Sequence, residues 1–255
     1  MPFDLGGLRV VVTRASDQAA GLVAALRAAG GCPAELPLLA VVPPADPRPL
    51  ERAASELPLF DWIAFASANA VEALLSLAAG ALPARLRVAA VGPATAAALR
   101  AFGIEPHLEA PLSGAEGLAE ALAPHVARRR RVLLPQAADA RPVLATRLEQ
   151  AGAEVVAVVA YDKRLPADAA ARARELFAGE PLGWVTFTSP RIVRHFVEVL
   201  GGEWAARRGE LRAASIGPVT SAELRGRGVE PAAEAERASD EGLVVAVVAA
   251  ALARG

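Results

Sequence analysis

Short apolar runs alternate with longer amphipathic stretches along the whole chain. RVVVT at 9–13 and RVLLP at 131–135 are rich in β-branched and aliphatic residues, which is typical of strands buried in parallel sheets. Helical patterns follow them and end at Gly30 and Gly152, a common residue after a helix. Further strands are expected over WIAFAS at 62–67, RVAAVG at 87–92, WVTFTS at 184–189 and RAASIG at 212–217. This alternation predicts an α/β fold with parallel, doubly wound sheets.

The pattern occurs twice in the chain. Residues 8–30 match residues 130–152, and WIAFASANAVEALL at 62–75 matches WVTFTSPRIVRHFV at 184–197, both at a spacing of 122 residues. VGPATAAALRAFGIEP at 91–106 matches IGPVTSAELRGRGVEP at 216–231. Matches in one order over the chain indicate an internal duplication, and copies of this length predict two domains. Around five strands per copy favour a flavodoxin-like unit.

Composition narrows the class of protein. A chain of 255 residues with 54% hydrophobic and 22% charged residues is globular and long enough for two domains. The longest apolar run, at 243–253, is shorter than the roughly 20 residues that span a bilayer, and the N-terminus does not resemble a signal peptide. A single cysteine, Cys32, fits the cytoplasm, and a net charge of −1 indicates neither nucleic acid nor membrane as a partner.

Several chemistries are excluded by missing motifs. Lys163 is the only lysine and lies in YDKRLP, so the chain has no Walker A loop, and it has neither G-x-S-x-G nor G-x-G-x-x-G after a strand. His107, His125 and His195 lack the spacing of metal ligands, and we interpret them as structural or exposed. No metal site is expected.

The carboxyl ends of the predicted strands carry the candidate binding residues. Helix N-termini lie there, and their free N–H groups and dipoles favour anions. Ser, Thr and Gly-Pro turns open these helices, and arginines lie near them. The candidates are Arg14, Ser67, Asn69, Thr95, Arg141, Thr188, Ser189, Arg191, Gly217 and Thr220. The alternative is that the hydroxyls only cap helices and that Gly-Pro is only turn chemistry.

Tyr161, the only tyrosine, lies in the predicted strand VVAYDKRLP. A strand tyrosine is commonly a packing residue. If it faces a cleft between the domains, its hydroxyl could donate a proton.

Together these motifs resemble the uroporphyrinogen-III synthase family over nearly the whole chain. The matching stretches are VVVTRA, FASANAVEALL, AAVGPATAAALRAFGIEP, AEGLAEAL, GAEVVAVVAYD, VTFTSPRIVRHF and SIGPVTSAELRGRGVEP. The resemblance implies two flavodoxin-like parallel-sheet domains joined by a two-stranded connector, with the site in the cleft. It implies a crossed chain, in which residues 1–38 and 164–255 form one domain and residues 39–163 form the other, including the connector strands. The repeat by itself fits tandem and crossed arrangements equally.

The resemblance also implies a reaction, the cyclisation of hydroxymethylbilane to uroporphyrinogen III with loss of water and inversion of ring D. Tyr161 aligns with a tyrosine that assists departure of the hydroxyl, and the candidate anion-binding residues become substrate-binding residues for a bilane with eight carboxylates. Gln136 stands where many relatives have arginine. No cofactor is implied, and we expect a cytoplasmic monomer.

Two other functions remain open at this point. Twin α/β domains with anion-receptive helix starts also fit a non-catalytic binding protein for a small anionic ligand. The flavodoxin-like pattern also fits a flavin-binding protein.

Overall fold

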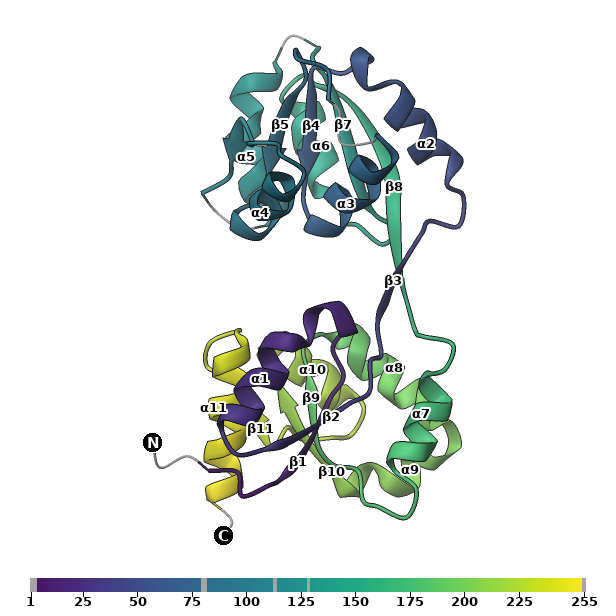
Figure 1. Cartoon of the computed structure of the whole chain (residues 1–255), viewed down its shortest axis with the longest axis vertical. Helices are drawn as coiled ribbons and strands as arrows, with labels where there is room; N and C mark the ends of the chain where they lie inside the picture. Colours follow the sequence, from purple (N-terminus) through teal and green to yellow (C-terminus); the bar gives the residue numbers. More distant parts are fainter. Residues whose placement is uncertain (1–3, 79–81, 112–113, 128, 254–255) are drawn as a thin grey trace. The chain divides into compact units, whose positions relative to one another are not determined.

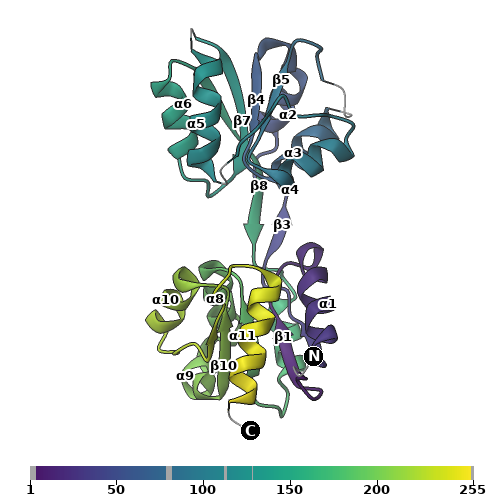
Figure 2. The same cartoon turned by 90° about the vertical axis from the view of Figure 1, so that its left-hand side faces the viewer.

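The computed structural model describes residues 4–78, 82–111, 114–127 and 129–253. The chain folds into two compact units (Figure 1): unit 1 is Met1–Ala40 with Arg164–Gly255, and unit 2 is Val41–Lys163. Both boundaries lie inside strands, β3 (Ala40–Val42) and β8 (Glu154–Arg164), which are hydrogen-bonded neighbours (Figure 2). The chain therefore passes between the units through a two-stranded connector.

Unit 1 is built on a five-stranded sheet in which every neighbouring pair is parallel. Its order is β2-β1-β9-β10-β11. The strands are β1 (Arg9–Val12), β2 (Cys32–Glu35), β9 (Gly183–Phe187), β10 (Leu211–Ser215) and β11 (Ala233–Glu234). The helices are α1 (Ala20–Ala28), α7 (Ala169–Leu176), α8 (Pro190–Leu200), α9 (Trp204–Arg207), α10 (Pro218–Gly226) and α11 (Asp240–Leu252), with 3₁₀ turns at Ser16–Gln18, Gly201–Glu203 and Arg208–Glu210.

The helices of unit 1 cover both faces of its sheet. Successive side chains of a strand point to opposite faces, and β1 shows this clearly. Val11 packs in the core that contains residues of α7, α8 and α10, whereas Val10 and Val12 pack with residues of α1 and α11. All three valines are fully buried, so the apolar run predicted from the sequence is a central strand with a core on each side.

Unit 2 contains a six-stranded sheet of order β3-β8-β7-β4-β5-β6, and its pairs from β8 to β6 are parallel. Besides β3 and β8, the strands are β4 (Trp62–Phe65), β5 (Arg87–Ala90), β6 (Leu108–Glu109) and β7 (Arg131–Ala137). The helices are α2 (Arg48–Ser55), α3 (Ala68–Leu77), α4 (Pro93–Ala101), α5 (Ala115–Val126) and α6 (Val143–Gln150), with a 3₁₀ turn at Leu57–Leu59. Ile63 and Phe65 pack with α2, α3 and α4, and Trp62 and Ala64 pack with α5 and α6. The α/β class and parallel sheets predicted from the sequence are confirmed.

The strand order shows how the duplicated chain is distributed. Numbered along the chain, the strands of unit 1 run 2-1-3-4-5, the flavodoxin order. Unit 2 has the same order when it is read from β7, with β8, β7, β4, β5 and β6 in place of β2, β1, β9, β10 and β11. The first two strands of each repeat therefore pair with the last three strands of the other repeat.

Among the residues that the structure describes, no helix is long and apolar enough to cross a membrane.

Candidate functional site

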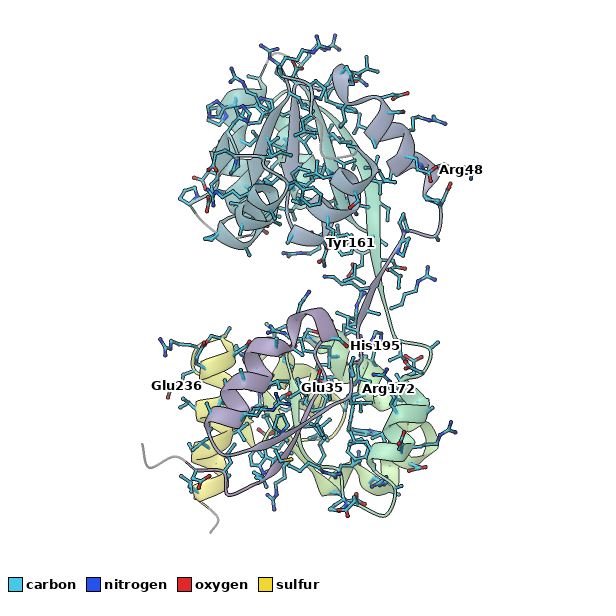
Figure 3. All side chains as sticks on the ribbon, viewed as in Figure 1. Glu35, Arg48, Tyr161, Arg172, His195 and Glu236 are labelled. Atoms are coloured by element: carbon cyan, nitrogen blue, oxygen red, sulfur yellow. The ribbon has the colours of Figure 1, made fainter. Side chains whose placement is uncertain are left out.

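Tyr161, labelled in Figure 3, lies in β8, and its ring is part of the core of unit 2. Its hydroxyl reaches the start of α3. Its Oη is 3.0 Å from Oγ of Ser67. Ser67 is the N-cap of α3, and the same Oγ accepts a hydrogen bond from the backbone N–H of Ala70 at 3.2 Å. The phenol is thereby held at the carboxyl end of β4, beside a helix N-terminus that favours negative charge.

From the sequence, Tyr161 and Ser67 are separate candidate residues, and the hydrogen bond between them was not predicted. β7 lies between β8 and β4 in the sheet, so the two residues come from strands about 10 Å apart, twice the usual strand spacing. The long phenol side chain spans that gap and the short serine side chain does not. The pairing depends on the order of strands in the crossed fold, which the repeat pattern leaves open.

Lys163 is a second feature of this site that the sequence did not single out. Its Nζ lies 5.7 Å from the centroid of the Tyr161 ring, and its side chain is half-buried. A cation at this distance from an aromatic ring is attracted by the electrons of the ring. The sequence contains a signal for this contact, because Tyr161 and Lys163 are two positions apart in one strand and so lie on the same face of the sheet.

Two equivalent helix starts are capped by serine. Ser67 in α3 and Ser189 in α8 each accept the backbone N–H three residues further on, at 3.2 and 3.4 Å. Asn69 and Arg191 occupy the second position of these helices, and Thr188 precedes the cap of α8; all three are half-buried. The serines are helix caps, as the alternative interpretation of the sequence held, and Ser67 also bonds Tyr161.

The other pair of equivalent helix starts is capped by glycine. In the part of the chain that the structure describes, neither Gly92 of α4 nor Gly217 of α10 provides a side-chain cap, and proline follows each. Thr95 and Thr220 lie three residues after the glycines and are buried. They are inside the first turn and are not N-caps, so capping does not account for their hydroxyls. These two starts have backbone N–H groups without a capping side chain, the property that suits an anion.

The candidate arginines differ in how strongly they are paired. Nη1 of Arg14 donates to Oδ1 of Asp240 at 2.7 Å, and both side chains are about three-quarters buried. At the equivalent positions of unit 2, Gln136 and Ala115 replace both members of the pair. A substrate carboxylate at Arg14 would therefore compete with Asp240. Arg141 is exposed, and its nearest carboxylate oxygen, on Glu116, is 3.8 Å away.

The repeated Glu-Pro of the two long matching stretches has a structural role. Arg100 bonds Glu105 and Arg225 bonds Glu230 through Nε and Nη2, which ties the end of each helix to the following turn. The arginine hydrogen bonds hold the pKa of the Glu105 and Glu230 carboxyls below its usual value. These pairs lie at the surface, and they account for the repeated glutamate without a ligand.

Two of the histidines have backbone partners. Nδ1 of His107 accepts the N–H of Val88 at 3.2 Å, and Nδ1 of His195 lies 2.6 Å from the carbonyl oxygen of Leu38 (His195 is labelled in Figure 3). These contacts fit a structural role. Over the described ranges of the chain, His, Cys, Asp and Glu side chains form no group of three or more that could hold a metal ion.

Comparisons with known sequences converge on one family. The family model described as uroporphyrinogen-III synthase HemD matches residues 20–245. The uroporphyrinogen-III synthase of Synechococcus elongatus is 35% identical over 252 residues, covering 94% of each chain. A putative uroporphyrinogen-III synthase of Methanothermobacter thermautotrophicus is 33% identical over 233 residues, covering 86% of this chain and 90% of the relative.

Comparisons with solved structures concern the fold alone. A mutant uroporphyrinogen III synthase from Thermus thermophilus aligns with a TM-score of 0.59 at 23% identity, over 97% of this chain and 100% of that one. Uroporphyrinogen-III synthetase from Helicobacter pylori aligns with a TM-score of 0.63 at 17% identity, over 95% of this chain and 99% of that one.

Proposed function

Because the chain belongs to the uroporphyrinogen-III synthase family of lyases in tetrapyrrole biosynthesis, we propose that Tyr161 and the helix starts carry out that reaction here. The substrate is hydroxymethylbilane, and the products are uroporphyrinogen III, with ring D inverted, and water. The observation that carries the assignment of Tyr161 is the hydrogen bond between its Oη and Oγ of Ser67, at a strand end beside a helix N-terminus.

The reaction begins with departure of the hydroxyl from the hydroxymethyl carbon of ring A. Oη of Tyr161 donates a proton to the leaving oxygen as the carbon–oxygen bond breaks, which releases water and leaves a phenolate and an electrophilic, positively charged azafulvene. Oγ of Ser67 orients the phenol and donates a hydrogen bond to the phenolate that remains. The helix N-terminus at Ser67 further favours this transient negative charge.

Ring D then attacks through its substituted α-carbon and gives a spiro intermediate, which fragments and closes in the inverted sense. The pyrrole proton lost at closure returns to the phenolate, so protons balance over the cycle. Since the bilane is already reactive, the protein mainly holds the correct carbon near the electrophile, which is catalysis by positioning. No step needs a metal or an organic cofactor.

Both units supply the groups proposed to bind the carboxylates of the bilane. The Gly-Pro helix starts offer backbone N–H groups without capping side chains, and the serine starts offer hydroxyls beside half-buried polar residues. The proposed substrate-binding residues are Arg14, Thr188, Ser189, Arg191, Gly217 and Thr220 of unit 1, and Ser67, Asn69, Thr95 and Arg141 of unit 2.

We further propose that residues 1–38 with 164–255 and residues 39–163 are the functional domains, a division supported by the two compact units of the fold. We propose a cytoplasmic monomer. Cys32 is the single cysteine and is exposed and free, as suits a reducing compartment.

Protection by a stable relative of the product tests the polycarboxylate site. Uroporphyrin III carries all the carboxylates of the product, and it is expected to raise the Tm in a concentration-dependent way. The gain is about 2.7 kcal/mol when its concentration is roughly 100 times its Kd. Differential scanning fluorimetry measures the shift.

Coproporphyrin III, with half the carboxylates on the same ring system, is the matched control, and its shift at equal concentration is expected to be clearly smaller. Equal shifts with both porphyrins would contradict binding through the carboxylates. Stabilisation by flavin mononucleotide alone would favour a flavin-binding protein instead.

A further inference from the structure

In unit 1, two buried serines and an exposed glutamate are joined by hydrogen bonds. Oγ of Ser215 lies 2.5 Å from Oγ of Ser221, and the Ser221 hydroxyl in turn bonds Oε2 of Glu234. Ser215 ends β10, Ser221 is in the first turns of α10, and Glu234 is in β11. Both serines are fully buried.

The carboxylate of Glu234 determines which group donates in each of these hydrogen bonds. An ionised glutamate only accepts hydrogen bonds, so the Ser221 proton points to Glu234. Ser221 must then accept the proton of Ser215. Both serine hydroxyls therefore donate a hydrogen bond. The bond from Ser221 to Glu234 is charge-assisted, which makes it stronger than a bond between neutral groups.

The internal duplication supplies a built-in comparison. At the equivalent positions of unit 2, which lie 125 residues earlier, the chain has Ala90, Ala96 and Glu109. Both alanines are fully buried, and the glutamate is kept in the equivalent strand, β6. The hydroxyls are therefore absent in a unit with the same strand order.

Two backbone hydrogen bonds are common to both turns, and in unit 1 the N–H of Thr220 also bonds the Gly217 carbonyl at 3.1 Å. Ile216 donates to Phe187 at 3.0 Å, as Val91 donates to Phe65 at 3.0 Å. The N–H of Ser221 reaches Gly217, as that of Ala96 reaches Gly92, both at 3.1 Å. The Gly-Pro turn of unit 2 forms without the two hydroxyls. The serines of unit 1 are therefore not required to form this kind of turn.

The serine pair closes a ring of side chain and backbone around Ile216–Thr220, the segment that holds Gly217 and Thr220. The two glycines also differ in conformation: Gly217 is extended at φ 160°, whereas Gly92 has φ 95°, in the region that favours glycine. The extended turn is thus the one that carries the hydrogen-bonded chain.

We propose that Ser215, Ser221 and Glu234 are positioning residues that hold the Gly217–Thr220 helix start for a carboxylate of the substrate. This rests on the proposed function of that helix start. The three side chains act by fixing where the backbone N–H groups and the Thr220 hydroxyl point. The start of α4 in unit 2 lacks these hydrogen-bonded serines, so the two Gly-Pro helix starts do not contribute equally to substrate binding.

Steady-state kinetics with hydroxymethylbilane test the proposal. Ser221→Ala, which places in unit 1 the residue that unit 2 already has, is expected to raise KM about fivefold and leave kcat within a factor of about two. Glu234→Ala is expected to do the same, and Glu234→Gln, which keeps an accepting oxygen, to recover most of the loss.

Two matched controls separate positioning from stability. Glu109→Ala removes the equivalent glutamate of unit 2, and Thr186→Val removes a buried hydroxyl of unit 1 that bonds the Val11 carbonyl at 3.1 Å. Both are expected to leave KM unchanged, although Thr186→Val lowers the Tm. An unchanged KM in Ser221→Ala, or an equal rise in Glu109→Ala, overturns the proposal. An inactive wild-type protein would instead overturn the proposed function itself.

Discussion

Replacing Tyr161 by phenylalanine is expected to lower kcat about 100-fold and to leave KM within a factor of about two. The substitution removes the hydroxyl that bonds Ser67 and leaves the ring in the core of unit 2. The bilane is still bound through its carboxylates, but the leaving hydroxyl has lost its proton donor. Single-turnover and steady-state rates of bilane consumption measure the effect.

Ser67→Ala is the informative companion to this variant. It removes both the partner of Tyr161 and the cap of α3, so it is expected to lower kcat less than Tyr161→Phe and to cost about 1 kcal/mol of stability. Ser239→Ala removes the cap of α11 in unit 1, a bond of 3.1 Å to the N–H of Gly242, and does not touch the Tyr161–Ser67 pair. It should cost similar stability and leave kcat unchanged, and any effect through the neighbouring Asp240–Arg14 pair should fall on KM. Unchanged turnover in Tyr161→Phe would remove Tyr161 from the mechanism.

Replacing Thr220 by valine is expected to lower kcat/KM about tenfold, mainly through KM, with little change in the free energy of unfolding. Thr220 is buried in the first turn of α10, where Gly217 and not Thr220 is the N-cap. Valine keeps the shape of the side chain and removes only the hydroxyl proposed to bind the substrate. Kinetics together with urea denaturation separate the two effects.

The opposite result for Thr220→Val would be equally clear. Full activity combined with a drop in stability means that the hydroxyl has a structural role alone. A loss of activity that tracks the loss of folded protein has the same meaning, because the loss then comes from the fold.

The architecture was largely predictable because its signals are local. Buried runs such as RVVVT show no polar alternation, which indicates parallel strands, and the duplication is visible at fixed spacing. The Gly-Pro turns were placed at strand ends from the same logic, and Gly92 and Gly217 begin helices there. At these positions the local sequence pattern and the geometry of parallel sheets predict the same structure.

The pairings within the candidate site were less predictable because they depend on which strands are neighbours. Tyr161 meets Ser67 across an intervening strand, and Arg14 meets Asp240 although 226 residues separate them. Neither pair follows from spacing, since the repeat fits tandem and crossed arrangements equally. Gln136 is explained only by comparing the units, which shows that the arginine and its aspartate are replaced together.

The isomer composition of the product tests the account most directly. The purified protein is incubated with fresh hydroxymethylbilane, the products are oxidised to porphyrins, and the type I and type III isomers are separated by chromatography. We predict predominantly the type III isomer, formed much faster than the bilane closes without protein. Type I isomer alone, formed at the uncatalysed rate, would contradict the account.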